Sequence, residues 1–295
     1  MEILDAAFMQ RALLAALLVG ITAPAIGIYL VQRHQALMGD GIGHVALTGV
    51  GLGFMLNASP VWVAAAVCVA GAVIMELTRF YGKARGDIAL AMLFYGGMAG
   101  GVMLINLSGG SNANLVTYLF GSLTTVSRQD LVAICILAAF VILATLGLRR
   151  QLFAICQDEE FARVTGLPVR LLNLLVAITA ALTVTVAMRV VGLLLVSALM
   201  VIPVAASQQI ARSFATTLAL SVGIGVLVTL SGTTTSYYVD VPPGATIVLL
   251  AIGVFVLLTA IAAPLAKSRA RKVEDEERCT LGEPGSATAP DDVRV

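Results

Sequence analysis

The sequence predicts an all-α fold, a polytopic bundle of transmembrane helices with eight to ten spans. Hydrophobic residues make up 59% of the 295 and charged residues only 12%, and the mean hydropathy is +0.98. A soluble domain is nearer half apolar and a quarter charged. Apolar runs of about the 20 residues that cross a bilayer recur along most of the chain. We therefore expect a transmembrane domain over residues 1–267 and a disordered cytoplasmic tail over 268–295, which is charged and then rich in small residues and proline.

Nine apolar runs are the expected spans. They lie near residues 12–32, 38–57, 60–80, 88–107, 130–148, 171–189, 190–211, 214–236 and 245–265. Pro24 and Pro203 fall inside two of these runs and predict kinks. The run at 38–57 is crowded with glycines, which predicts either close helix packing or a non-helical break that lines a pore. The stretch 113–123 is too short to span and predicts a re-entrant or interfacial segment.

Lysine and arginine indicate the orientation, because cytoplasmic loops carry an excess of them. Three clusters fall on one side of the predicted bundle: Arg79, Lys83 and Arg85; Arg149, Arg150, Arg163 and Arg170; Lys267, Arg269, Arg271 and Lys272. We expect that side to be the cytoplasm. The N-terminus is then expected outside.

The longest polar interruption between spans is "FAICQDEEFARVTGLPVRLL", residues 153–172. Asp158, Glu159 and Glu160 suit the first turn of a helix, where they favour the positive end of its dipole. Gly166 suits the end of that helix. We expect a short amphipathic helix on the cytoplasmic face. The pattern alone leaves open whether it is a solvated loop or a docking surface for a partner.

Two ionisable residues stand out in the second run, "MGDGIGHVALTGVGLGF". Asp40 and His44 are four residues apart, so on a helix they share a face. Ionisable groups inside a span are costly and mark ion pathways, although Asp40 could instead cap a helix and His44 could be an interior residue with a hydrogen-bond partner. A carboxylate and an imidazole together suit a transition metal. A two-fold dimer would offer two of each, which matches the roughly four ligands that zinc takes.

Several chemistries lack their motifs. The sequence contains no GxxxxGK[ST] phosphate loop, no HExxH helix and no GxSxG serine motif, so neither ATP hydrolysis nor those enzyme activities are expected of it. Its four cysteines are scattered without a CxxC pair, which argues against a disulfide framework or a cysteine zinc site. The spans also lack the acidic residues of proton-coupled transporters. Energy for transport would therefore come from another subunit.

Five segments, in order, resemble the membrane permease of zinc/manganese-type metal ABC importers. They are "MGDGIGHVALTGVGLG" (38–53), "VTYLFGSLTTVSRQDL" (116–131), "DEEFARVTGL" (158–167), "MRVVGLLLVSALMVIPVAAS" (188–207) and "YYVDVPPGATIVLL" (237–250). The resemblance runs from about residue 10 to 265. It implies a type II ABC importer-like fold, a location in a bacterial inner or plasma membrane, and a chain that is not itself an enzyme.

The same resemblance implies partners and sites. It implies a homodimer, two ATP-binding subunits on the cytoplasmic face and an extracellular or periplasmic metal-binding protein, with Zn²⁺ or Mn²⁺ moved inward and no cofactor bound by this chain. The implied metal ligands are Asp40 and His44, and the implied ATPase-coupling residues are Asp158, Glu159, Ala162 and Gly166. Some zinc-importing relatives have a further histidine where this chain has Tyr95, which leaves zinc, manganese and iron open. The alternative is an ATP-independent secondary transporter or channel for metal ions or protons.

Overall fold

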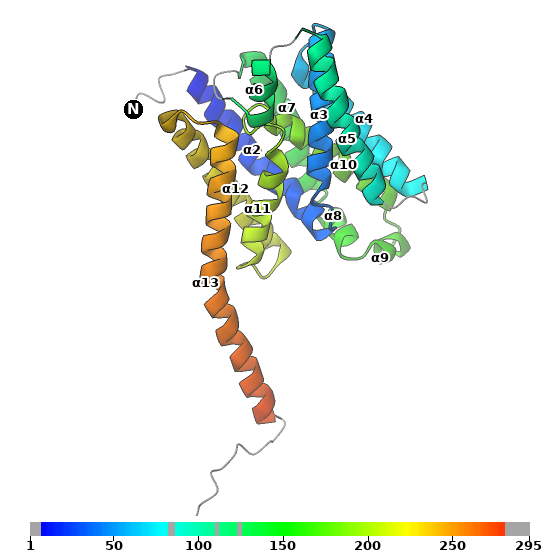
Figure 1. Cartoon of the computed structure of the whole chain (residues 1–295). Coiled ribbons are helices and arrows are strands. Elements are labelled where there is room, and N and C mark those ends of the chain that lie inside the picture. Colours follow the sequence, from blue (N-terminus) through cyan, green and yellow to red (C-terminus); the bar gives the residue numbers. More distant parts are fainter. Residues whose placement is uncertain (1–6, 82–85, 110–111, 123–125, 281–295) are drawn as a thin grey trace, which may run out of the picture.

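The structure is a computed structural model that describes residues 7–81, 86–109, 112–122 and 126–280. Within these ranges every regular element is a helix, which confirms the all-α prediction. The helices are α2 (Ala7–Gln32), α3 (Met38–Met55), α4 (Pro60–Tyr81), α5 (Gly86–Leu107), α6 (Asn112–Phe120), α7 (Arg128–Gly147), α8 (Arg149–Gln157), α9 (Glu159–Val164), α10 (Val169–Ala187), α11 (Val196–Gln208), α12 (Phe214–Val239) and α13 (Pro243–Thr280). Most of them run side by side as a bundle, with α8 and α9 at one end and α6 at the other (Figure 1).

Seven helices of the described chain are long and apolar enough to cross a membrane: α2, α4, α5, α7, α10, α12 and α13. Two predicted spans differ. α3 has 18 residues, but Asp40, His44 and its glycines make it less apolar than the others. α11 has only 13 residues, and a helix needs about 20 to span on its own. By length and composition alone seven helices of the described chain qualify as spans, so the predicted count of eight to ten is not confirmed.

The predicted span at 190–211 is shorter than expected, because residues 188–195 form turns and helix α11 begins only at Val196. Gly192 sits there with a φ of 86°, a left-handed conformation that favours glycine. The amides of Leu193 and Leu194 donate to the carbonyls of Tyr118 and Leu119 at the end of α6. The short helix α6, predicted as a re-entrant or interfacial piece, therefore docks on this turn.

Three glycines allow main chain to lie directly on main chain at this place. A Cβ atom added to Gly121, Gly192 or Gly244 would overlap backbone atoms of the neighbouring segment. The end of α6, the turn 188–195 and the start of α13 therefore meet through their backbones. We call this meeting place the outer junction, because it lies at the end of the bundle away from α8 and α9.

A buried ion pair fastens the outer junction to α7. Arg189 Nη2 lies 3.1 Å from Asp130 Oδ2, and the two side chains are 12% and 7% exposed. The Arg189 guanidinium also lies over the Tyr118 ring, 4.8 Å from its centroid. Asp130 completes a capping box with Ser127 at the start of α7. One carboxylate thus caps a helix and balances a buried cation.

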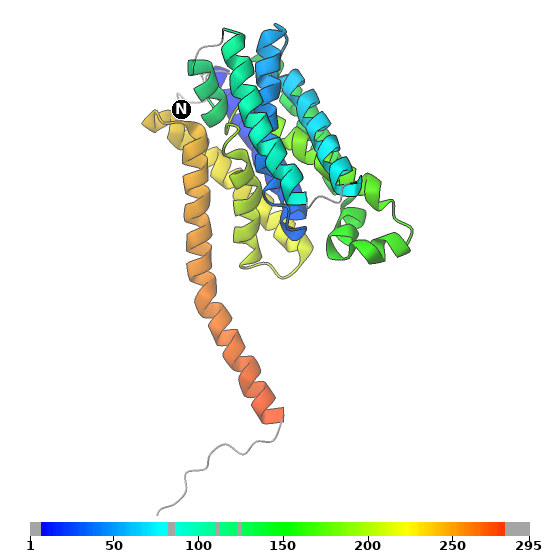
Figure 2. The same ribbon diagram turned by 45° about the vertical axis from the view of Figure 1, so that its right-hand side comes forward.

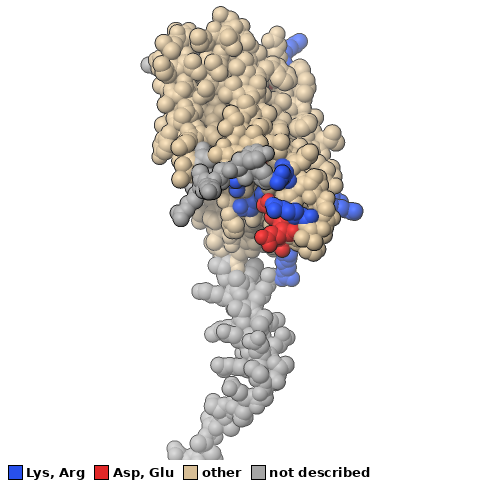
Figure 3. Space-filling view, turned by 90° about the vertical axis from the view of Figure 1, so that its right-hand side faces the viewer, with Lys and Arg blue, Asp and Glu red and all other residues tan. Residues whose placement is uncertain are grey.

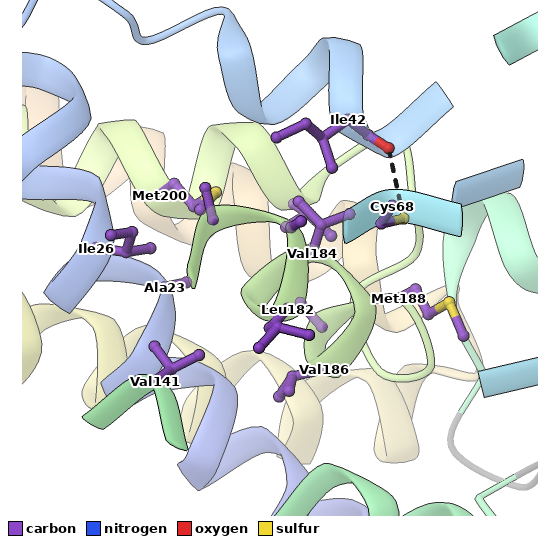
Figure 4. Close-up of a cluster of buried hydrophobic side chains, with 14 of the residues drawn as sticks. Ala23, Ile26, Ile42, Cys68, Val141, Leu182, Val184, Val186, Met188 and Met200 are labelled. Atoms are coloured by element: carbon purple, nitrogen blue, oxygen red, sulfur yellow. Dashed lines mark hydrogen bonds between the residues drawn. The ribbon is translucent and has the colours of Figure 1, made fainter. Parts of the chain in front are cut away.

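The hydrophobic core lies where α2, α3, α4, α10 and α11 cross. Figure 4 shows side chains from these helices converging, among them Ile26, Ile42, Val184 and Met200, which are at most 1% exposed. The thiol of Cys68 lies 3.9 Å from the Ile42 carbonyl. In a membrane such contacts stabilise through close packing rather than through exclusion of water. Pro24 and Pro203 lie inside α2 and α11, and the kinks expected of them stay a prediction.

Charged side chains gather at the end of the bundle that carries α8 and α9. Figure 2 shows these two short green helices together beside the bundle, and Figure 3 shows a charged band at that end below an almost uncharged face. Arg79, Arg149, Arg150, Arg163 and Arg170 belong to α4, α8, α9 and α10 there. Their position agrees with the predicted cytoplasmic side. Lys83 and Arg85 lie outside the described residues, as do the side chains of residues 267–272.

The first part of the predicted disordered tail continues the last helix. α13 continues to Thr280, so residues 268–280 are helical. Residues 281–295 lie outside the described part, and their disorder stays a prediction.

Candidate metal path and docking surface

The helix that carries Asp40 and His44 is tightly enclosed. α3 is continuous from Met38 to Met55, so of the two alternatives that its glycines suggested, close packing is the one found and a non-helical break is not. It packs against α4, α5, α10 and α11. A Cβ on Gly97 of α5 would lie 2.7 Å from the His44 backbone, and one on Gly43 would lie 3.0 Å from the Leu193 carbonyl. The α5 backbone therefore passes directly beside His44.

Asp40 and His44 occupy different depths of this enclosure. Asp40 is half-buried in the first turn of α3, and Ser197 Oγ of α11 donates to its carboxylate over 3.4 Å. His44 is 7% exposed. Its ring meets Phe94 of α5 edge-on, with the centroids 4.0 Å apart. Asp40 therefore faces α11, and His44 faces α5.

The pair does not form a complete metal site within one chain. Among the described residues, no group of three or more His, Cys, Asp or Glu side chains could hold an ion. Asp40 has a serine hydroxyl nearby and His44 an aromatic ring. Two ligands are fewer than zinc or manganese takes. Further ligands would have to come from water or from a second chain.

The short helix predicted within residues 153–172 is present as α9, and it has a defined start and end. Asp158 is the N-cap of α9, and its Oδ1 accepts from the amides of Glu160 and Phe161 over 2.9 and 3.0 Å. Gly166 follows the helix with a φ of 84°. The sequence did not predict α8, which precedes α9 and ends at the same Asp158. The two helices thus form one unit at the charged end.

The four residues expected to couple to an ATPase fall in different surroundings. Gly166 is exposed, with open space around it. Ala162 is completely buried, so its predicted place on the same partner-facing side as Gly166 is wrong. Its small side chain instead allows α9 to pack on its own chain. Asp158 caps α9, and Glu159 turns toward this chain's own polar groups.

Glu159 joins α9 to the rest of the bundle. Its carboxylate lies 3.5 Å from Arg33, whose side chain is 9% exposed, and 3.7 Å from Arg163. Asn173 of α10 donates to it over 3.4 Å. Arg33 directly follows α2 and begins the segment that leads into α3. Helix α9 is thus connected to the segment that leads into the helix that carries Asp40.

The comparisons with known proteins agree with this architecture. The model of the family described as "ABC 3 transport family" matches residues 5–262. The chain belongs to the ABC 3 transport family. It is a multi-pass membrane protein, as expected for this family and from its seven apolar helices.

Named relatives in the ABC 3 transport family cover nearly the whole chain. The manganese transport system membrane protein MntC of Halalkalibacterium halodurans is 33% identical, over 87% of this chain and 88% of its own length. The chelated iron transport system membrane protein YfeD of Yersinia pestis is 31% identical, over 85% and 84%. The solved structure of PsaBC from Streptococcus pneumoniae in complex with Fab matches with a TM-score of 0.79 and 29% identity, over 87% of this chain and 94% of that one.

The sequence analysis did not identify two apolar side chains of α9 that the structure shows to be exposed. Phe161 and Val164 are 65% and 86% exposed and lie three residues apart, so they share a helix face. The charged residues around them indicate a helix outside the hydrocarbon of the membrane. One sequence pattern could have revealed them. In a short charged helix, a small residue such as Ala162 faces inward, and apolar residues spaced like Phe161 and Val164 then face outward.

Proposed function

We propose that this chain is the permease subunit of an ABC importer that moves a divalent transition metal into the cell, driven by ATP hydrolysis on a separate subunit. The observation that carries the proposal is the Asp40–His44 pair, placed on one face of a glycine-packed helix inside a family of membrane transport proteins. The carboxylate supplies the negative charge that a divalent ion needs at low dielectric. The imidazole supplies a nitrogen ligand.

The permease core is proposed to be a homodimer. One chain offers only a single carboxylate and a single imidazole at this site, and a two-fold axis would bring two of each together. The half-exposed carboxylate of Asp40 is available for such an arrangement. Native mass spectrometry of the detergent-solubilised complex tests it, with two permease copies expected. A fully active complex with one permease copy would refute the homodimer.

The metal is proposed to be manganese or zinc. Relatives are named for manganese and for chelated iron, and an aspartate with a histidine accepts both manganese and zinc. At the position where some zinc importers carry a histidine, Tyr95 is 66% exposed and stacks edge-on against Phe94. The absence of that ligand favours manganese. The His44→Asp variant should shift preference further toward manganese, because it gives an all-oxygen site.

The transport test uses matched changes at both histidines and at two aspartates. Asp40→Asn and His44→Asn should each lower uptake of radioactive Mn²⁺ at least about tenfold, a loss of roughly 1.4 kcal/mol in the transition state. The controls are Asp240→Asn and His34→Asn. Both control residues have positive φ, which asparagine tolerates. Uptake at the wild-type rate by Asp40→Asn would refute the metal path.

Coupling to the ATPase is proposed to run through α9. Phe161 and Val164 form the apolar contact, and Gly166 leaves room beside them. The Val164→Lys variant should lose co-purification of the ATPase subunit, whereas Val239→Lys, at the outer end of α12 and 61% exposed, should keep it. Equal co-purification by both variants would remove the docking surface. Uptake that persists without any ATPase would favour a channel or secondary transporter instead.

The Arg33–Glu159 pair is proposed to transmit movement of α9 to α3. Arg33→Glu or Glu159→Arg alone should leave docking intact and weaken metal-stimulated ATP hydrolysis, because the two like charges would repel each other. The double exchange should recover much of the stimulation. Single variants with normal stimulation would show that this contact transmits nothing.

A further inference from the structure

An apolar groove runs up the side of the bundle from the cytoplasmic end. It has a volume of about 700 Å³ and lies between α2, α7, α8 and α12. Its inner surface includes Ile21, Ile142, Leu146, Leu218 and Val222. Both α7 and α12 pack against α2, so α2 forms the floor and the other two form the walls. The groove is distinct from the Asp40–His44 region and from the exposed face of α9.

Two arginines stand at the cytoplasmic rim of this groove. Arg149 and Arg150 line it at the start of α8, and both are exposed. No aspartate or glutamate is among its lining residues. In the part of the chain that the structure describes, neither arginine has a carboxylate within ion-pair distance. Ser213, the N-cap of α12, also lies on this rim, and a helix N-terminus adds positive potential.

The apolar part of the groove extends from the charged rim well into the membrane-spanning part of the bundle. Arg149 follows Ile142 by seven positions, and Val222 follows Ser213 by nine. At 1.5 Å per residue these spacings correspond to about 10 and 13 Å. The groove therefore joins a cationic mouth at the level of the lipid headgroups to an apolar slot in the hydrocarbon layer. This arrangement is complementary to an anionic lipid, with its phosphate above its acyl chains.

We propose that this groove binds one anionic phospholipid of the cytoplasmic leaflet. Its phosphate lies between Arg149 and Arg150, and an acyl chain lies along Leu146, Leu218 and Val222. The bound lipid holds the start of α8 in place. Because α8 ends at Asp158, the residue that caps α9, the lipid also steadies the helix of the docking surface. The lipid site itself does not depend on which ion is transported.

The experiment measures lipid retention by the purified full chain. Protein from detergent is mixed with phosphatidylglycerol or phosphatidylcholine of matched acyl chains, and native mass spectrometry counts bound lipid. We expect wild type to retain phosphatidylglycerol in preference. Arg149→Gln combined with Arg150→Gln should weaken that retention roughly 30-fold. The control is Arg163→Gln with Arg170→Gln, which removes the same charge at the same end but outside the groove and should leave retention unchanged.

A second variant separates a lipid from other occupants. Ala219→Trp fills the groove without changing charge, and it should also reduce phosphatidylglycerol retention. Equal retention of the two lipids by wild type, or unchanged retention in the arginine double variant, would overturn the proposal. A competition with inorganic phosphate gives a further test. If phosphate displaces the lipid equally from wild type and from Ala219→Trp, the site binds only an anion, and the proposal is also overturned. Self-crosslinking of Ala219→Cys in lipid-free detergent would assign the groove to a second copy of the chain.

Discussion

The buried Asp130–Arg189 ion pair should dominate the stability of the outer junction. The Asp130→Asn substitution keeps the size of the side chain and an oxygen that can accept from the Ser127 amide, as Asp130 Oδ2 does over 3.2 Å. It removes the charge opposite Arg189, whose guanidinium is 3.1 Å away and whose side chain is 12% exposed. Arg189 Nε already lacks a hydrogen-bond partner. The variant therefore leaves a buried cation without its anion.

The expected size of the effect follows from that burial. Removing one partner of a buried pair costs about 3–5 kcal/mol. The pair of Arg163 with Glu159 is the comparison, because those side chains are 68% and 44% exposed and such surface pairs contribute about 0–1 kcal/mol. Arg163→Gln should therefore destabilise the chain by well under 1 kcal/mol. The double variant Asp130→Asn with Arg189→Met should recover most of the loss from Asp130→Asn, because it buries no charge and keeps the oxygen that caps α7.

Reversible unfolding in mixed micelles, followed by far-ultraviolet circular dichroism, measures these differences. The midpoint of denaturation should fall clearly for Asp130→Asn and barely for Arg163→Gln. If the two single variants lose equal stability, Arg189 is reached by water or by lipid phosphate. The argument from burial would then be wrong. If the double variant is less stable than Asp130→Asn, the ion pair stabilises the folded chain by more than the mutual neutralisation of two buried charges.

Further predictions concern single positions. Gly192→Ala should destabilise the chain by about 2 kcal/mol or more, because its φ is 86°; thermal unfolding of the purified chain would show the shift. Asp158→Ala should cost α9 its cap, about 1 kcal/mol, and weaken ATPase docking, while Asp158→Asn should retain both in a co-purification assay. Burial raises the pKa of the Cys156 thiol to about 11, so at pH 8 its thiolate is scarce; peptide mass spectrometry should show slow alkylation by N-ethylmaleimide that accelerates as pH rises toward 11, whereas an introduced Val164→Cys should react quickly at pH 8.

Most of the spans could be predicted because each depends on residues close together in the sequence, and the orientation stays a prediction. The long apolar runs that become α4, α7 and α12 need only length and composition, and the arginines that flank α8 indicate the cytoplasmic side. The start of helix α9 near Asp158 could also be predicted from the sequence, because an N-cap side chain contacts amides only two and three residues away. These features depend on local physics, so a single sequence contains them.

Other features depend on partners distant in the chain and could not be predicted. The helix expected over 190–211 begins only at Val196, because the backbone of the turn around Gly192 hydrogen-bonds to the end of α6, more than 70 residues earlier. The apolar run itself reads as a plain helix. The inward side of Ala162 likewise depends on which face of α9 meets the bundle. The ion pair between Asp130 and Arg189, 59 residues apart, gives no signal in one sequence, because any arginine could in principle pair with any aspartate.

The backbone contacts of the outer junction have a consequence for how the chain can vary. Where two side chains clash, a second substitution elsewhere can restore the fit by making its partner smaller. At Gly121, Gly192 and Gly244 the atoms that a new Cβ would meet are main-chain atoms, which no substitution can shrink. A screen for suppressors of Gly192→Ala should therefore return reversion to glycine, whereas a screen that starts from Asp130→Asn can succeed by changing Arg189. The outer junction thus contains positions whose substitution a second change can compensate, and positions whose substitution no second change can compensate.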